Sequence, residues 1–129
     1  MQRRFGGLDR LFGVMPAAQM RASRIAVVGI GGVGSWTAEA LARSGVSYLR
    51  LIDLDNVAES NVNRQIHALT STIGMAKVDA MRERIAQINP SCQVEVVEDF
   101  LTPENCAEML EGVDGFIEAC DQIRAKETI

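Results

Sequence analysis

The sequence predicts an α/β fold, a Rossmann-like parallel sheet with flanking helices. An apolar run at residues 25–28 has the length and composition of a buried strand. Glycines interrupt this run, and apolar residues with helical spacing follow from Val33 onward. Strand-like and helix-like segments then alternate along the chain. This alternation predicts parallel strands joined by right-handed helical crossovers.

The glycines within residues 29–34 (GIGGVG) have the G-x-G-x-x-G order of nucleotide-binding folds. We expect Gly29 to turn the chain off the strand, Gly31 to let the backbone approach a phosphate and Gly34 to let the helix pack on the strand. Gly32 removes one more side chain that would hold a nucleotide away. Amide groups at the start of the helix would then face an anion. A tight strand-to-helix turn without a ligand is the alternative interpretation.

The remaining elements follow from periodicity and from start and stop signals. Gly45 and Gly112 end two of the helices, and Thr102 followed by Pro103 and Glu104 marks a helix start. The expected strands span residues 24–28, 48–52, 93–97 and 116–119, and the expected helices span residues 32–44, 75–89 and 102–111, with a further helix beginning at residue 121.

We expect two regions, a helical arm at residues 1–22 and a nucleotide-binding Rossmann-like domain at residues 23–129. Leu8, Leu11 and Met15 share one helical face of the arm, which would pack on the domain or on a partner. A parallel sheet that ends near residue 129 keeps an open edge, and such edges are usually covered. We therefore expect the sequence to be the N-terminal part of a longer protein.

The composition is that of a globular domain. The 129 residues are 47% hydrophobic and 23% charged, and the formal net charge is −4. This charge argues against a nucleic-acid-binding surface over the whole domain, although a local basic patch stays open. The three cysteines form no C-x-x-C pair, so we expect neither a disulfide framework nor a zinc site. No apolar segment is long enough to span a membrane, and a cytoplasmic location is expected.

An acidic segment follows the second expected strand. Asp53 lies about 20 residues beyond the glycines, where a carboxylate of a dinucleotide fold accepts hydrogen bonds from ribose hydroxyls. Asp55 is a second candidate in the same segment. A helix cap or a turn residue is the alternative role for Asp53.

The loop after this strand is rich in amide and guanidinium donors. Asn61, Arg64 and Gln65 lie at the carboxyl end of the strand, where ligands bind in open α/β sheets. The planar fork of an Arg side chain suits a phosphate. The alternative is a solvated loop in which Arg64 pairs with a nearby carboxylate. His67 is the only histidine, and a structural role is favoured over a chemical one.

Lys77 falls in the first turn of an expected helix, where a cation opposes the helix dipole. An anion nearby would compensate, so Lys77 is a second candidate phosphate ligand, with a solvated Lys as the alternative. Asp121 follows the last expected strand and reaches the same edge of the sheet. Its carboxylate could hold Mg²⁺, which prefers oxygen ligands and substrate phosphates.

The combination of these candidates favours a triphosphate over a nicotinamide dinucleotide. A dinucleotide site needs the glycines and one ribose acid, but it does not need Arg64 and Lys77 as well. The additional cations suit ATP, whose charge must be neutralised before its α-phosphorus is attacked. An NAD-dependent oxidoreductase and a non-catalytic interaction module remain the rivals from other classes.

Five ordered motifs resemble those of the ubiquitin-activating-enzyme-like adenylating superfamily, and the resemblance covers nearly the whole chain. These motifs are GIGGVG at 29–34, DLD at 53–55, SNVNRQ at 60–65, GMAK at 74–77 and CD at 120–121. Bacterial members of this superfamily activate sulfur-carrier proteins with ATP. Within it, the chain looks most like the branch of tRNA threonylcarbamoyladenosine dehydratases, on the evidence of RFGG at 4–7, GSW at 34–36, NRQIHAL at 63–69, QINP at 87–90 and DFLTP at 99–103.

The resemblance implies roles for the candidate residues. The glycines would shape the ATP loop, Asp53 would bind ribose, and Asn61, Arg64 and Lys77 would contact phosphates. Asp121 would bind magnesium or orient the attack. An arginine of the arm, Arg4 or Arg10, would reach the γ-phosphate bound by the other subunit.

The resemblance also implies a substrate and partners. The activated carboxylate would belong to threonylcarbamoyladenosine 37 of tRNA, and cyclisation would follow its adenylation. The alternative substrate is the C-terminus of a ubiquitin-like sulfur carrier. The implied partners are tRNA, a cysteine desulfurase with its sulfur-acceptor protein, and a second copy of the chain in a homodimer. The C-terminal half of the family domain, including the zinc-binding C-x-x-C pairs of many members, would be missing from this sequence.

Overall fold

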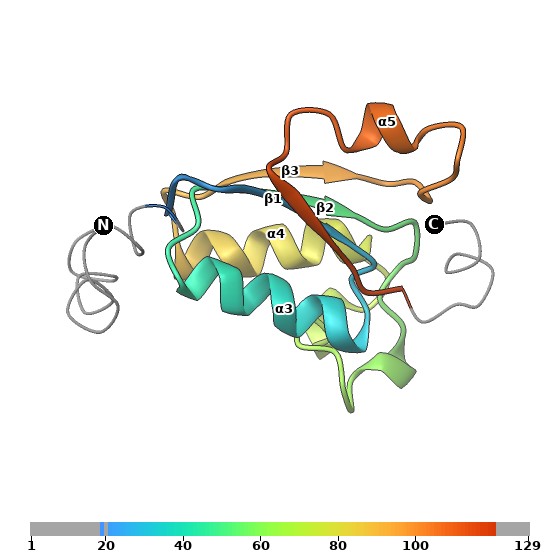
Figure 1. Ribbon diagram of the computed structural model, residues 1–129. Coiled ribbons are helices and arrows are strands. Elements are labelled where there is room, and N and C mark those ends of the chain that lie inside the picture. Colours follow the sequence, from blue (N-terminus) through green and yellow to red (C-terminus); the bar gives the residue numbers. More distant parts are fainter. Residues whose placement is uncertain (1–18, 20, 121–129) are drawn as a thin grey trace.

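The computed structural model describes residue 19 and residues 21–120, which form a parallel sheet with helices on its two faces (Figure 1). The strands are β1 (Arg24–Val28), β2 (Tyr48–Ile52), β3 (Gln93–Val97) and β4 (Gly115–Glu118). They lie in the order β3-β2-β1-β4, and every pairing is parallel. The predicted fold class is therefore confirmed, with strand bounds that differ from the prediction only at β4.

Helices α3 (Gly32–Arg43) and α4 (Lys77–Ile88) cover one face of the sheet, and the short α5 (Cys106–Met109) lies on the other (Figure 1). Two turns of 3₁₀ helix, Glu59–Asn61 and Thr70–Thr72, interrupt the long connection between β2 and α4. The crossovers place the loops that follow β1, β2 and β3 at one edge of the sheet, as expected for parallel strands.

The main core lies between the sheet and helices α3 and α4. Val27 and Leu49 of the strands are fully buried, and so are Val78, Met81 and Ile85 of α4. Burial of each such side chain contributes about 1.5–3 kcal/mol. A second, smaller cluster lies between the opposite face and α5. The larger core fixes α3 and α4 on the strands, and with them the loops at the carboxyl edge.

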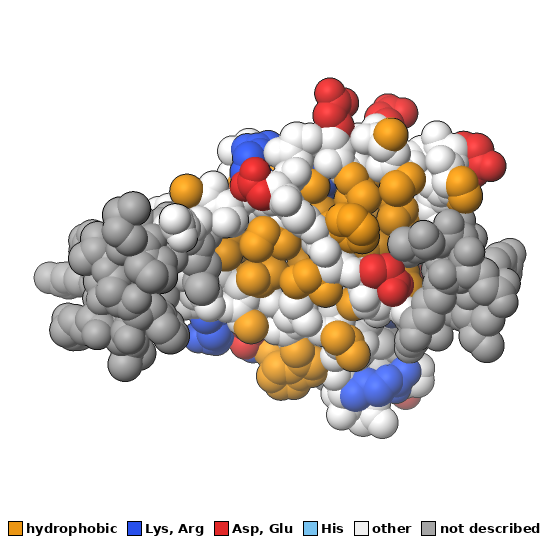
Figure 2. Space-filling model, in the orientation of Figure 1, with side chains coloured by type: hydrophobic (Ala, Val, Ile, Leu, Met, Phe, Trp, Pro, Cys, Tyr) orange, Lys and Arg blue, Asp and Glu red, His pale blue; other side chains and the backbone are white. Residues whose placement is uncertain are grey.

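β4 is an edge strand within the described part of the chain. Figure 2 shows apolar side chains gathered over the face on which β4 lies, and Phe116 of β4 is 47% exposed. This exposed apolar surface agrees with the expectation of an open edge at the end of the sheet.

Two helices differ from their predicted spans. The helix predicted at residues 102–111 is limited to α5, although Thr102 and Asn105 bond to each other's backbone amides and the Cys106 amide donates to the Thr102 carbonyl, as at a helix start. α4 begins at Lys77 rather than at residue 75, because the Lys77 amide donates to the carbonyl of Asp55 in an extended pairing. The predictions for residues 1–18 and 121–129 lie outside the described residues.

A carboxylate of α3 ties the two large helices together. Glu39 is 8% exposed and accepts hydrogen bonds from Arg84 of α4 and from Arg43 one turn further along α3. Burial raises the pKa of Glu39, but the hydrogen bonds and charges of the two arginines outweigh it, so the net pKa lies below its ordinary value. The ionised form therefore stabilises the fold.

The glycine bend allows α3 to start in direct contact with the end of β1. Gly29 has a φ of +91°, which a side chain rarely tolerates. A Cβ on Gly34 would lie 1.6 Å from the carbonyl oxygen of Gly29. These two positions therefore require glycine, as the motif predicted.

We predict that Gly34→Ala destabilises the protein by about 1–3 kcal/mol, because the added methyl group overlaps backbone that cannot move away cheaply. Gly115→Ala is the matched control, since a Cβ there meets nothing within 4 Å. Urea unfolding of both variants tests the prediction. Equal stabilities would show that α3 does not depend on this close approach.

We predict that Glu39→Gln destabilises the protein by about 1–2 kcal/mol at pH 7 and by progressively less as the pH falls below about 4.3. The sign follows from the lowered pKa: the stabilisation is present above the pKa of the unfolded chain and is lost as the pH falls through the folded-state pKa. Urea unfolding between pH 7 and pH 3.5 measures the difference. Glu83→Gln, on the exposed face of α4, should show no such convergence.

Candidate functional site

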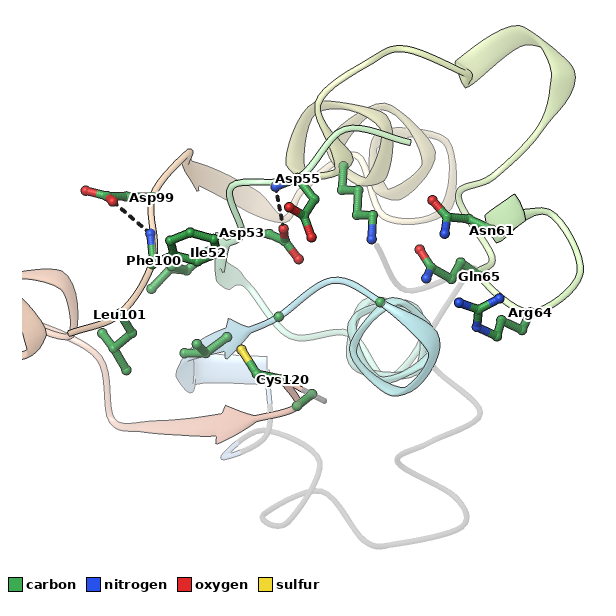
Figure 3. Close-up of a pocket in the computed structure, with 15 residues that line it drawn as sticks. Ile52, Asp53, Asp55, Asn61, Arg64, Gln65, Asp99, Phe100, Leu101 and Cys120 are labelled. Atoms are coloured by element: carbon green, nitrogen blue, oxygen red, sulfur yellow. Dashed lines mark hydrogen bonds between the residues drawn. The ribbon is translucent and has the colours of Figure 1, made fainter. Parts of the chain in front are cut away.

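A pocket lies at the carboxyl edge of the sheet, where loops after all four strands meet (Figure 3). Such an edge is the ligand-binding side of an open α/β sheet. The pocket is lined by Val28, Gly29, Gly31, Ile52, Asp53, Asp55, Asn61, Arg64, Gln65, Lys77, Asp99, Phe100, Leu101, Ala119 and Cys120. It therefore collects residues that lie up to about 90 positions apart in the sequence.

The two ends of the pocket differ in chemistry. Figure 3 shows Phe100 and Leu101 at one end, and Asn61, Gln65 and Arg64 at the other with their polar groups directed inward. The carboxylates of Asp53 and Asp55 lie between these ends (Figure 3). An apolar end, a carboxylate middle and a donor-rich end match the order of base, ribose and phosphate in a nucleotide.

The structure brings together most of the predicted site residues. Asp53, Asp55, Asn61, Arg64, Gln65 and Lys77 all line the pocket, together with Gly29 and Gly31. Gly32 and Gly34 do not line it. Gly34 packs under the bend against Gly29, and a Cβ on Gly32 would face the Arg64 side chain at 4.0 Å. Asp121 lies outside the described residues.

The peptide groups of Ile30 are held from both sides. The Ile30 amide donates to Oδ2 of Asp53 at 2.6 Å, and the Ile30 carbonyl lies 2.8 Å from Nε2 of His67. The other oxygen of Asp53 accepts from the amide of Asp55 at 2.7 Å. Asp53 therefore fixes the glycine bend as well as facing the pocket, a role that was not predicted from its position in the sequence.

His67 has the structural role favoured by the sequence. It is 1% exposed, and because a carbonyl only accepts, its Nε2 must carry the proton that is donated to Ile30. Burial lowers the pKa of His67, the bond to the Ile30 carbonyl opposes this shift, and the charge of Lys77 adds to it. His67 therefore supports the bend as a neutral imidazole.

The guanidinium of Arg64 forms no ion pair with a described carboxylate. Its Nη1 donates at 3.1 Å to the carbonyl of Ser60 and at 3.1 Å to Oδ1 of Asn63. The alternative in which Arg64 pairs with a nearby carboxylate is therefore wrong. Arg64 is exposed, and its remaining donors face the pocket (Figure 3).

Lys77 is 7% exposed, yet its ammonium has neither a hydrogen bond nor an ion pair among residues 21–120. A buried charge without a partner is costly unless an anion or water compensates it. Its position in the first turn of α4 adds to this cost, because the positive end of the helix dipole lies there. Lys77 also lines the pocket, where a bound anion would compensate its charge.

The start of α3 offers backbone donors to the same region. No side chain caps this helix, and no acidic residue occurs in its first turn. Asn61 adds an amide donor, because its Oδ1 accepts from the Ala58 amide at 2.8 Å and its Nδ2 is left for the pocket. The uncapped amides, Asn61, Arg64 and Lys77 together form an environment for a polyanion.

One wall of the pocket was not predicted from the sequence. Asp99, Phe100 and Leu101 follow β3 and line the pocket, and Phe100 is 42% exposed. Their position could have been predicted from the sequence, because they lie at the carboxyl end of a parallel strand, as Asp53 does. Cys120 also lines the pocket, although the cysteines were expected to fill apolar space.

No group of three or more His, Cys, Asp or Glu side chains within the described residues could hold a metal ion. Mg²⁺ usually binds through one or two carboxylates together with phosphates and water. The carboxylates of the pocket are compatible with such a shared site but do not form a metal cage by themselves. The prediction that Asp121 holds Mg²⁺ remains a prediction.

The thiol of Cys92 is not a nucleophile, because burial raises its pKa to about 11. Cys92, Cys106 and Cys120 form no disulfide with one another. Among the described helices, none has the length and hydrophobicity to cross a bilayer.

Comparisons with known proteins agree on one family. The ThiF family model matches residues 7–129. A tRNA threonylcarbamoyladenosine dehydratase of Escherichia coli is 50% identical over 129 residues, which cover 99% of this chain and 48% of the relative. A molybdopterin-synthase adenylyltransferase of Haemophilus influenzae is 31% identical over 111 residues, which cover 86% of this chain and 46% of the relative.

The fold agrees with the crystal structure of the E. coli dehydratase in complex with ATP. The TM-score is 0.94 at 52% identity, and the match covers 98% of this chain and 53% of that one. A structure of the same E. coli protein in complex with AMP gives a TM-score of 0.95. The chain thus spans about half the length of the relatives that it matches. On the sequence match and the shared fold, the chain belongs to the ThiF family.

Proposed function

We propose that the pocket binds ATP and that the protein adenylates a carboxylate. The observation that carries this proposal is Lys77, a residue only 7% exposed whose ammonium has no partner among the described residues and which lines the pocket together with Arg64 and the glycine bend. Two cations and uncapped helix amides offer more positive charge and more hydrogen-bond donors than the pyrophosphate of a dinucleotide needs. The E. coli dehydratase, at about 50% identity, has crystal structures in complex with ATP and with AMP.

In the proposed complex, the adenine lies against Phe100 and Leu101 and the ribose hydroxyls meet the free lone pairs of Asp53 and Asp55. The phosphates extend toward Arg64 and Lys77, with Asn61, Gln65 and the amides near Gly31 as further donors.

The proposed reaction is nucleophilic displacement at phosphorus. A carboxylate oxygen bonds to the α-phosphorus while the bond from this phosphorus to the oxygen bridging to the β-phosphate breaks, and pyrophosphate leaves. The protein contributes position and charge neutralisation rather than a covalent group. Mg²⁺ bound with the phosphates would supply additional neutralisation, with Asp121 as its proposed ligand.

We further propose threonylcarbamoyladenosine 37 of tRNA as the carboxylate, by analogy with the dehydratases named above. Adenylation makes the carboxylate oxygen a leaving group with AMP, so that cyclisation of the threonylcarbamoyl group removes the elements of water. A local basic surface, rather than the acidic domain as a whole, would bind the tRNA. A homodimer in the cytoplasm that works with a cysteine desulfurase and its sulfur acceptor completes this proposal.

A sulfur-carrier protein is the second candidate substrate. The molybdopterin-synthase adenylyltransferase among the relatives favours it, although its identity of 31% is lower than that of the dehydratases. Both candidates present a carboxylate to the same pocket, so they differ in the acceptor and not in the use of ATP.

We predict exchange of labelled pyrophosphate into ATP when tRNA bearing threonylcarbamoyladenosine is present. The assay uses the protein at full length, with unmodified tRNA and with a carrier protein ending in Gly-Gly as parallel substrates. Exchange with the carrier alone would reject the tRNA substrate. The adenylation proposal fails if no carboxylate, tRNA included, supports exchange.

We predict that Lys77→Ala and Arg64→Ala each weaken ATP binding by roughly tenfold to a hundredfold, as expected for the loss of a charged hydrogen-bond donor. Arg82→Ala is the control, because Arg82 lies on the exposed face of α4 and pairs with Asp79. Calorimetric titration with ATP and with NADH measures the effect. Tight NADH binding that Lys77→Ala leaves unchanged would instead support an oxidoreductase.

A further inference from the structure

An exposed tryptophan is bonded to the backbone of a proposed phosphate-binding residue. Trp36 lies on α3, one turn after the glycine bend, and is 55% exposed. Its Nε1 donates to the carbonyl of Arg64 at 2.9 Å. Water could satisfy an indole N–H at this exposure, so the bond to Arg64 is not needed to compensate burial of the indole. The bond instead fixes Arg64, a loop residue, to helix α3.

The residue before Trp36 fixes the same loop at a second point. Ser35 is fully buried, and its Oγ accepts from the amide of Ile66 at 3.3 Å. Consecutive residues of α3 thus hold the peptide groups on both sides of Gln65. A Cβ on Gly32 would lie 4.0 Å from Cδ of Arg64, an ordinary contact distance, so the Arg64 side chain runs beside the start of α3.

We propose that Trp36 is a positioning residue, which holds Arg64 where its guanidinium meets the phosphates of the nucleotide. This inference rests on the proposed function, because it assigns Arg64 to a triphosphate. α3 begins in the glycine bend, so a bond from α3 to the Arg64 carbonyl sets the distance between the bend and the guanidinium. Without this bond, the hydrogen bonds of Arg64 to other described residues all lie within its own loop, to Ser60, Asn61 and Asn63.

A purely structural role for Trp36 makes a different prediction. If the indole only stabilised the loop or the fold, its loss would lower stability and would weaken all ligands of the pocket alike. If it acts through Arg64, its loss weakens ligands that carry phosphates and spares those that do not. The dependence on phosphate therefore separates the two roles.

The test is Trp36→Phe, which keeps an aromatic ring but removes the N–H donor. We expect ATP to bind roughly three- to tenfold more weakly, as for the loss of one hydrogen bond, and adenosine to bind unchanged. Val33→Ala is the matched control, since Val33 is 66% exposed on the same helix and donates no side-chain hydrogen bond. Calorimetric titration of each variant with ATP and with adenosine provides the comparison.

A double variant shows whether Trp36 acts through Arg64. In the Arg64→Ala background, Trp36→Phe should weaken ATP binding no further, because the guanidinium that the indole positions is already absent. If the two residues acted independently, the fold-losses of ATP affinity in the two single variants would multiply in the double variant. Effects that multiply, or equal losses of ATP and adenosine affinity, would overturn the inference.

Trp36 also supplies a spectroscopic readout, because it is the only tryptophan of the chain. ATP should change its emission in the unmodified protein, and Arg64→Ala should reduce this change at saturating ATP. Failure of the unmodified protein to bind ATP would reject the proposed function itself. Normal ATP binding by Trp36→Phe would reject only the positioning role.

Discussion

The close approach of α3 to the end of β1 is the constraint on which the site depends. Gly34 lies so near the carbonyl of Gly29 that no side chain fits between them. This contact directs the uncapped start of α3 to the carboxyl edge of the sheet. It also brings Ser35 and Trp36 to the loop that carries Arg64. A larger residue at position 34 would therefore disturb the bend, the helix amides and the Arg64 loop together.

Electrostatics make the pocket favourable for an anion. Burial lowers the pKa of His67 and keeps the imidazole neutral although its bond to the Ile30 carbonyl opposes this shift, and the nearby charge of Lys77 favours the neutral state. The carboxylate of Asp53 is occupied largely by the amides of Ile30 and Asp55 and does not form an ion pair with Lys77. The ammonium is thus left for a ligand. Protein stability alone would favour a neutral or paired residue at this position.

Sequence patterns predicted the sheet and brought most of the candidate residues to one pocket. The strands could be located because short apolar runs bounded by glycine and polar residues are typical of buried strands. The carboxyl edge then followed from parallel topology, which is why Asp53, Asn61 and Lys77 could be assigned to one site. Errors arose in the extent of helices. The chain begins a helical turn at Thr102, as Thr102, Pro103 and Glu104 had indicated, but continuous helix forms only over Cys106–Met109.

The sequence by itself determined the order of the elements, the positions that require glycine and the edge at which the polar residues gather, because each depends on spacing along the chain. Only the tertiary structure decided that Asp53 and His67 hold Ile30, that Phe100 forms a wall and that Trp36 binds Arg64. These contacts join residues 23, 37 and 28 positions apart in the three hydrogen-bonded cases. Which residues form these contacts depends on how the helical crossovers pack on the sheet. The periodicity of the sequence does not show which side chains from different crossovers meet.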